Sequence, residues 1–373
     1  MMSMLFRYLR RALWLLPVLL LPVTAFANGT CRTVKEDPTE EDQWRVASDY
    51  TGEVTITFLG DCTLGGETPS PYPSVSFARR IEDNGIEFPF RDLTKLTAAD
   101  DLTVANLEGV LTDRNLTKTD KTYNFMGPTW YTDILKVGSV ECVTLANNHS
   151  HDYGEPGYRD TKAALEEAGV CWFGLDAPAI WETEDGLRIG FLGVGSSLTT
   201  GRLKTYKQYA KRLEDYGCAA IITVMHAGTE YSYSPPDAYQ KQIVTRAAPY
   251  TDLIIGHHPH VPQGYTVYDG VPVVYSLGNC VFGGNPNSKE RDALVVQAVL
   301  HFTDGELDRI DLHFWPISIT SDSHYNNYSP VFLSGEDAER VLEKIRKSTG
   351  NDPGPFDEEK GAVVSFPVGS RAE

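Results

Sequence analysis

The stretch Leu253–Val261 reads LIIGHHPHV, in which an apolar run stops at a glycine and is followed by three histidines in four residues. The apolar run is typical of a buried strand, and Gly256 lets the backbone turn as it leaves the sheet. Side chains two positions apart in an extended segment point to the same side, so His258 and His260 could address one site. Pro259 restricts the residue before it to extended geometry. Imidazole is the commonest protein ligand for zinc-like and iron-like metals, so the stretch indicates a metal site; a surface histidine cluster is the alternative.

Other strand-like runs also end in polar residues of the metal-binding kinds. They end at Asp61, at Asn106 and Glu108, at Asn147–His149, at His226 and at Asn279. Strands that alternate with helical patterns predict an α/β architecture, whose ligands bind in the crevice at the carboxyl ends of the strands. Carboxylate, amide and imidazole groups together form the ligand set of a two-metal hydrolytic centre, where paired ions activate water and clamp an anion.

The rest of the chain adds helices and a hairpin. Helical patterns cover Phe77–Asn84, Asp92–Ala99, Thr161–Ala168, Asp237–Ala248 and Ser334–Lys347. The dipeptide Asp304-Gly305 is a hairpin turn pattern between two strand-like runs, Ala293–Phe302 and Leu307–Ile319. Antiparallel strands therefore join the strands of the α/β part, and a mixed sheet is expected.

Composition and charge restrict the function. The 373 residues are 41% hydrophobic and 23% charged, as in a folded globular protein, and the formal net charge is -18. Nucleic-acid binding relies on Lys and Arg to neutralise phosphates, so this balance excludes a general nucleic-acid partner. An anionic substrate would need a local counter-charge, which a bound divalent metal can supply.

The amino-terminal residues 1–27 have the pattern of a signal peptide. Three arginines precede the apolar run Ala12–Leu21, and the small-residue cleavage pattern Ala25-Phe26-Ala27 follows. We expect an exported protein, extracellular or at the cell surface; an uncleaved amino-terminal tether is the alternative. Residues 28–52 are expected to be a polar linker, 53–320 the main domain, and 321–373 a carboxyl-terminal helix and tail.

The six cysteines have no CxxC spacing, which argues against a cysteine zinc site. Cys62, Cys142 and Cys280 lie in or beside apolar runs and are predicted to be buried free thiols. In an exported chain some of the cysteines could pair.

Taken in order, these motifs resemble the CapA family of capsule and poly-γ-glutamate biosynthesis proteins, within the calcineurin-like metallophosphoesterase superfamily. The motifs are Gly60-Asp61, Asn106-Leu107-Glu108, Ala146–His149 with Asp152 and Gly154, His226 with Glu230, Gly256–Val261 and Ser276–Asn279. The resemblance covers roughly Val54–Phe282. It implies a sandwich of two mixed β-sheets flanked by helices, with the motifs on loops at one edge.

The resemblance also implies roles for individual residues. The implied metal ligands are Asp61, Glu108, Asn148, His226, His258 and His260, with His257 as a less secure candidate, for one or two divalent ions such as Mn, Fe or Zn. His149 would polarise the scissile bond. Asp152 would orient His149 or cap the following helix, and Glu230 would act as a general acid/base or pair with a ligand imidazole. Asn106, Asn147 and Asn279 are candidate substrate contacts, and for Asn279 a structural turn is the alternative.

Two departures from the superfamily pattern weaken a direct transfer of activity. Thr63 stands where the superfamily has a histidine two residues after the first Asp, and Glu108 stands in an Asn-Leu-Glu context. Such a site could hold a single ion, or hold it weakly.

Three functions remain open. The first is a metal-dependent hydrolase of phosphoester or related anionic bonds. The second is a cell-surface factor that binds or anchors an anionic polymer without hydrolysis, beside a polymer-synthesis membrane complex. The third is a binding module whose site has lost its metal.

Overall fold

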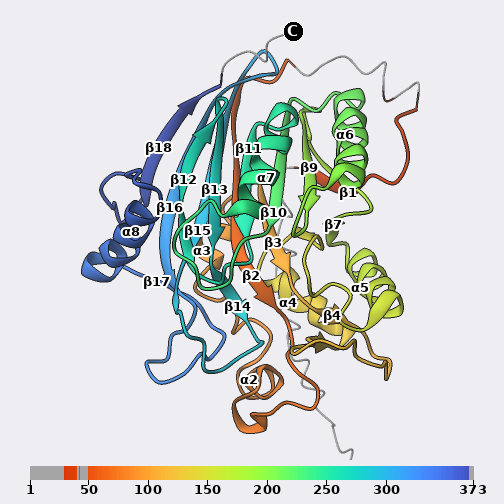
Figure 1. The fold of residues 1–373 in the computed structure, drawn as a ribbon, viewed down its shortest axis with the longest axis vertical. Coiled ribbons are helices and arrows are strands. Elements are labelled where there is room, and N and C mark those ends of the chain that lie inside the picture. The colour runs from red at the N-terminus through yellow and green to blue at the C-terminus, as the bar shows by residue number, and fades with distance from the viewer. Residues whose placement is uncertain (1–28, 40–41, 43–48, 369–373) are drawn as a thin grey trace, which may run out of the picture.

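The computed structural model describes residues 29–39, 42 and 49–368, so the predicted signal peptide lies outside the described residues. Two large mixed β-sheets pack face to face, and helices cover their outer faces (Figure 1). This confirms the predicted α/β sandwich of two mixed sheets flanked by helices. Within the described part of the chain, no helix is both long enough and apolar enough to cross a membrane.

The seven-stranded sheet has parallel strands at its centre and antiparallel strands at both edges. Its strands, in spatial order, are β1 (Gly29–Thr33), β8 (Ala179–Thr183), β9 (Arg188–Val194), β10 (Ala220–His226), β11 (Leu253–His257), β13 (Val271–Leu277) and β12 (Pro262–Tyr268). Helices α6 (Thr200–Asp215) and α7 (Ala238–Ala247) pack their apolar side chains on its outer face.

The nine-stranded sheet joins a parallel half to an antiparallel half through its central strand β2 (Gly52–Thr63). The path runs through β17 (Val331–Phe332), β16 (Glu306–Ser318), β15 (Asp292–Thr303), β2, β3 (Leu102–Leu107), β6 (Cys142–Thr144) and β7 (Cys171–Phe173). Two more strands lie off this path, β14 (Asn279–Phe282) beside β2 and β18 (Ala362–Pro367) beside β16.

Helices cover the outer face of this sheet and the end of the sandwich. The outer face carries α2 (Phe77–Asn84), α3 (Thr94–Thr97), α4 (Thr132–Val137) and α5 (Gly154–Ala168), beside a small pair of strands, β4 (Val110–Leu111) and β5 (Met126–Gly127). Helix α8 (Gly335–Thr349) packs against β12 and β16.

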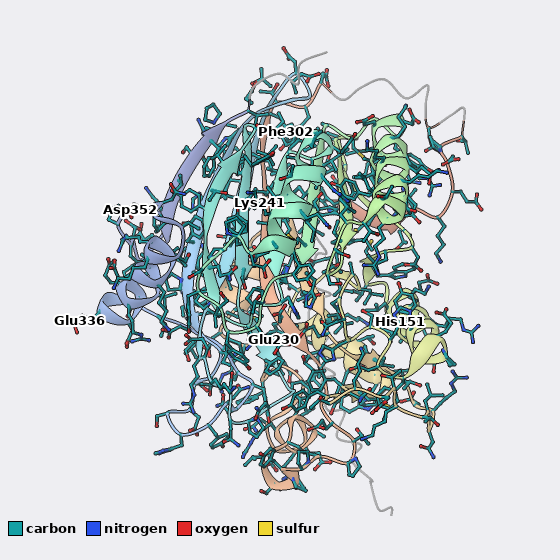
Figure 2. All side chains as sticks on the ribbon, in the orientation of Figure 1. His151, Glu230, Lys241, Phe302, Glu336 and Asp352 are labelled. Carbon is teal, nitrogen blue, oxygen red and sulfur yellow. The ribbon has the colours of Figure 1, made fainter. Side chains whose placement is uncertain are left out.

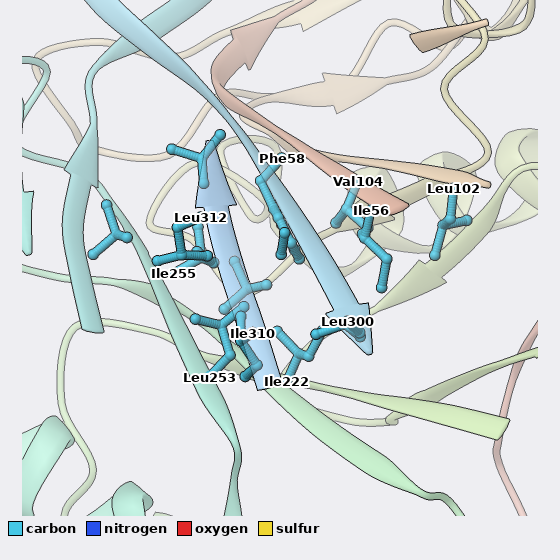
Figure 3. Packing of buried hydrophobic residues seen from close by; sticks show 14 of the residues in the cluster. Ile56, Phe58, Leu102, Val104, Ile222, Leu253, Ile255, Leu300, Ile310 and Leu312 are labelled. Carbon is cyan, nitrogen blue, oxygen red and sulfur yellow. The ribbon is translucent and has the colours of Figure 1, made fainter. Parts of the chain in front are cut away.

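The main core lies between the two sheets. Ile56 and Phe58 of β2 meet Ile222 of β10 and Ile255 of β11, and all four are fully buried (Figure 3). Leu59, the next residue of β2, belongs to the core on the opposite face. Because side chains alternate along a strand, β2 is buried on both sides, as its near-continuous apolar sequence predicts.

Several local predictions are confirmed. Helix α2 spans Phe77–Asn84 as expected, and Gly169 ends α5 in the left-handed conformation, with φ 75°. Asp304 and Gly305 both have positive φ at the tip of the β15–β16 hairpin, the geometry of the predicted turn. All six cysteines, including Cys62, Cys142 and Cys280, are free.

Other features differ from what the sequence indicated. Gly29–Thr33, inside the expected linker, forms the edge strand β1 and pairs with β8, and Ala362–Pro367, inside the expected tail, pairs with β16. Helix α6 was not predicted. The extended geometry predicted for His258 is wrong, because its φ is 98°. β11 ends at His257, and the backbone turns at the next residue, His258.

Gly256, which directly precedes the histidines, gives a test of how closely β11 and β13 must pack. A Cβ added there would lie 2.0 Å from the carbonyl oxygen of Tyr275 on neighbouring β13. We expect Gly256→Ala to lower the free energy of unfolding by about 1–3 kcal/mol, because two backbones must separate. Urea denaturation measures this effect. Gly201→Ala is the matched control, since a Cβ there meets nothing within 4 Å; equal midpoints for the two variants would contradict the prediction.

Candidate metal centre

Asp61 anchors the site at the carboxyl end of β2. Its side chain is fully buried, and its backbone N–H donates to the carbonyl of Gly278 at 2.9 Å. Oδ1 accepts a 2.7 Å hydrogen bond from Nδ2 of Asn106, and Oδ2 lies 3.1 Å from Nδ1 of His260. Burial alone would raise the pKa of this carboxyl, but the bond with His260 and the surrounding imidazoles hold it well below its ordinary value. Asp61 is therefore ionised.

Glu108 follows β3 and is also buried. Its Oε1 lies 3.1 Å from Nε2 of His226, yet neither carboxylate oxygen accepts a hydrogen bond from the described residues. Burial first, and the charge of Asp61 second, raise the pKa of Glu108 well above its ordinary value. A buried carboxyl beside a carboxylate, with no donor of its own, is the environment that a cation would satisfy.

His226 ends β10 between two amides. Its Nδ1 lies 3.1 Å from Nδ2 of Asn106, and its Nε2 lies 2.7 Å from Oδ1 of Asn148. Burial and the neighbouring ring of His258 lower the pKa of His226 well below its ordinary value. The imidazole is therefore neutral, as a metal ligand must be.

His258 and His260, which follow β11, bring two more imidazoles to the site. Nδ1 of His260 lies 2.8 Å from Oδ1 of Asn279, and the ring of His258 lies 4.7 Å from the ring of His226. Burial opposes charge on His260, but the hydrogen bond with Asp61 raises its pKa to about 9. The backbone has positive φ at His258 and His260, 98° and 56°. This conformation, and not the predicted extended one, places the two imidazoles next to each other.

Two sets of ligand-type side chains result. Asp61, Glu108 and His226 have ligand atoms within 4.8 Å of one another. Glu230, His258 and His260 form a second set by the same measure. Figure 2 places Glu230 beyond the carboxyl ends of β10 and β11, and its side chain is exposed.

His257 belongs to neither set. It is the last residue of β11, and its Nε2 lies 3.0 Å from the carbonyl oxygen of Leu59 on β2. The less secure candidate is therefore engaged in a contact between the two sheets.

His149 stands at the rim with a partner of its own. Its Nδ1 lies 2.7 Å from Oδ2 of Asp152, and its ring packs 4.5 Å from the ring of Phe125. Asp152 is fully buried, accepts 2.8 Å from the N–H of Phe125 and pairs at 2.9 Å with Nζ of Lys121. Asp152 thus orients the imidazole, which was one of its two predicted roles. The sequence did not point to Lys121 or Phe125, because both lie in a loop without a recognisable pattern.

The three candidate substrate asparagines are placed within the same network. Nδ2 of Asn147 donates to Oδ1 of Asn106 at 3.0 Å, and Oδ1 of Asn147 accepts from the N–H of His149. Asn106 in turn donates to Asp61, so Asn106 holds a proposed ligand in place and Asn147 holds Asn106 and His149. Nδ2 of Asn279 is buried without a hydrogen-bond partner among the described residues. Substrate contact by these residues stays a prediction.

The donor set fits a divalent cation. Two buried carboxyl groups, one amide oxygen and three imidazoles converge from separate strand ends, and Glu108 has no other means of satisfying its oxygens among the described residues. Such mixed oxygen and nitrogen donors suit Mn, Fe or Zn. The molecule is therefore an α/β sandwich protein with a buried carboxylate–imidazole centre that could hold a metal ion.

The family follows from comparison with known sequences. The model of the family described as bacterial capsule synthesis protein PGA_cap matches residues 55–284, and the chain belongs to this family. The resemblance to the CapA family is thereby confirmed.

Named relatives agree with the family. The chain is 26% identical over 325 residues to the capsule biosynthesis protein CapA of Bacillus anthracis, covering 80% of this chain and 74% of that protein. It is also 26% identical over 304 residues to the PGA biosynthesis protein CapA of Bacillus subtilis (strain 168), covering 74% and 76%. A solved structure of a hypothetical protein from Thermus thermophilus aligns with a TM-score of 0.45 and 15% identity, over 70% of this chain and 99% of that one.

Glu108→Gln separates metal binding from stability. The pKa of Glu108 is raised in the folded protein, so folding binds a proton, and stability from this group falls as the pH rises above the ordinary carboxyl range. With metal removed by a chelator, we expect the free energy of unfolding of Glu108→Gln to exceed that of wild type by about 1–3 kcal/mol at pH 8. The difference should be smaller at pH 5. Its affinity for Mn or Zn should fall by more than about 10–100-fold.

Urea denaturation at the two pH values and metal titration measure these effects. Glu167→Gln is the control, because Glu167 is exposed on α5 and belongs to neither set of ligand-type side chains. A Glu108→Gln protein that is less stable than wild type at pH 8 would contradict the prediction.

Proposed function

We propose that this protein is an exported accessory factor of capsule or poly-γ-glutamate metabolism, and that its buried centre holds a divalent metal to hydrolyse an anionic bond. The observation that carries the proposal is the convergence of Asp61, Glu108 and His226, all buried, beside the oriented pair His149–Asp152. Family membership and the names of the two Bacillus relatives support the polymer context. The signal-peptide pattern of residues 1–27 supports export.

The proposed ligands are Asp61, Glu108, Asn148, His226, His258 and His260. A divalent ion held there would polarise a carbonyl or phosphoryl oxygen and lower the pKa of water. The two sets of ligand-type side chains would accommodate one or two ions.

The protein's own residues would do the remaining work. Nδ1 of His149 donates to Asp152, and in the imidazolium form of that ring Nε2–H would also donate, to a substrate oxygen on which negative charge develops. Lys121 and the N–H of Phe125 fix the side chain of Asp152 in place. Glu230 is exposed beside His258 and His260 and would exchange protons with the solvent at the rim.

A cavity of about 570 Å³ lies near the ends of the site strands β2 and β14, and none of its lining residues is one of the proposed ligands. Gly65, Gly66, Gly283 and Gly284 line it, and they directly follow the site strands β2 and β14. A Cβ at Gly284 would lie within 3.0 Å of the rings of Phe125 and Phe282, so these aromatic rings separate the cavity from the imidazoles. We propose that a polymer chain lies along this cavity and reaches the centre past the rings of Phe125 and Phe282.

Binding without hydrolysis is the second candidate, and one observation favours it. Thr63 occupies the position where the superfamily has a ligand histidine, and its Oγ1 is buried without a hydrogen-bond partner among the described residues. The site would then have fewer nitrogen donors and would bind a metal ion less tightly. A metal ion in such a site could bind the carboxylates of the polymer without activating water.

His149→Asn distinguishes these candidates. The variant keeps the metal ligands and loses the group proposed to stabilise the developing charge, so we expect metal content to be unchanged and turnover to fall by about 100–1,000-fold. His151→Asn is the matched control, because His151 is exposed, stacks on Tyr158 and lies apart from Glu230 (Figure 2).

The assay uses phosphomonoesters, phosphodiesters and γ-glutamyl polymer, with metal content measured by elemental analysis. His260→Ala should lose both metal and turnover. Wild-type protein without stoichiometric Mn, Fe or Zn would refute the hydrolase proposal. Turnover that survives His260→Ala would place the active site elsewhere, and polymer binding without turnover would support the second candidate.

A further inference from the structure

Three cysteines from distant parts of the sequence meet far from the metal centre. Cys31 lies on β1, Cys142 on β6 and Cys171 on β7, and their sulfur atoms lie within 4.8 Å of one another. Cys142 and Cys171 stand directly opposite each other on neighbouring parallel strands. Cys31 comes from the other sheet, where β1 pairs with β8.

The first described strand lies where the two sheets meet at one edge of the sandwich. β1 is an edge strand of the seven-stranded sheet, and it packs against β7, the edge strand of the nine-stranded sheet. Oγ1 of Thr33 donates to the carbonyl of Trp172 and accepts from the N–H of the same residue at 3.3 Å. The N–H of Val34 donates to the carbonyl of Pro178 at 2.8 Å. Beyond its ladder with β8, this five-residue strand is held to β7 by few bonds.

We propose that Cys31 and Cys171 form a disulfide that fastens the amino-terminal strand to the edge of the opposite sheet, with Cys142 left as a buried free thiol. Cys171 is the better partner because β1 packs against β7, whereas β6 lies one strand further inside.

The surroundings of the sulfurs favour this pairing. Burial raises the pKa of all three thiols, but hydrogen bonds from Cys142, Cys31 and Thr33 lower the pKa of Cys171 to about 5, so its thiolate is the nucleophile. A structural zinc site is less suited, because it takes four ligands and the described residues supply three.

The bond forms by thiol–disulfide exchange. The thiolate of Cys171 attacks one sulfur of a small-molecule disulfide such as oxidised glutathione and releases one equivalent of its thiolate. Cys31, having given up its proton, then displaces the second equivalent from the mixed disulfide. Two protein thiols are oxidised, and one external disulfide is reduced to two thiols.

The bridge would matter if the chain before β1 is a tether. Tension on that segment would act on an edge strand held by one ladder, and a covalent link to the second sheet would stop β1 from peeling away. The loop between Cys31 and Cys171 is long, so the bridge also removes much conformational freedom from the unfolded chain.

The experiment treats purified protein with oxidised glutathione, blocks the remaining thiols and maps linked peptides by mass spectrometry without reduction. We expect a Cys31–Cys171 linked peptide and a melting temperature on the order of 5 °C above that of the reduced protein. Cys31→Ser should lose both effects. Cys218→Ser is the matched control, because this partly buried free cysteine lies outside the cluster, and it should keep both.

Three outcomes would overturn the proposal: alkylation of all three thiols after oxidant treatment, a Cys142–Cys171 link in place of the expected one, or zinc or copper retained at one equivalent with the three thiols protected until chelation. None of these readouts depends on the metal centre or on turnover, so the bridge can fail while the proposed function stands, and the reverse also holds.

Discussion

The burial of two carboxyl groups side by side is the constraint on which the site depends. Asp61 and Glu108 end neighbouring parallel strands of one sheet, and both are shielded from solvent. A buried carboxylate is tolerated only with a compensating charge or donors. Asp61 obtains them from Asn106 and His260, and Glu108 has none among the described residues. Glu108 therefore keeps its proton in the folded protein, and a bound divalent cation would let it ionise beside Asp61.

The compensating imidazoles come from the other sheet. His226 and His258 lie at the end of β10 and just beyond β11, so the centre exists only when the two sheets pack in the correct register. The inter-sheet core of Ile56, Phe58 and their partners fixes that register. Core packing would therefore be coupled to the proposed metal binding, and a bound ion should raise the stability of the folded protein.

The sequence pointed to most of the residues that meet at the centre because each is the polar end of an apolar run, and the carboxyl ends of parallel strands meet at one edge. It did not predict β1, whose polar residues gain their strand character from pairing with β8. Helix α6 was detectable in principle, since Leu203, Tyr206, Ala210 and Leu213 follow helical spacing. The turn at His258 was not, because residue preferences before proline favour extended backbone and tertiary contacts overrode them.

The net charge of -18 bears on how such a protein could meet an anionic polymer. Repulsion from distant surface carboxylates is screened beyond about 8–10 Å at physiological ionic strength, so local charges decide binding. Lys121 lies beside Asp152, and Lys289 lies 4.8 Å from the ring of Tyr231, which is itself 6.1 Å from the ring of His260. Lys121 is already paired with a buried carboxylate. If the two buried carboxyl groups hold a cation as we propose, attraction of a polyanion to this centre would depend mainly on that ion, and the same ion would serve both binding and the proposed hydrolysis.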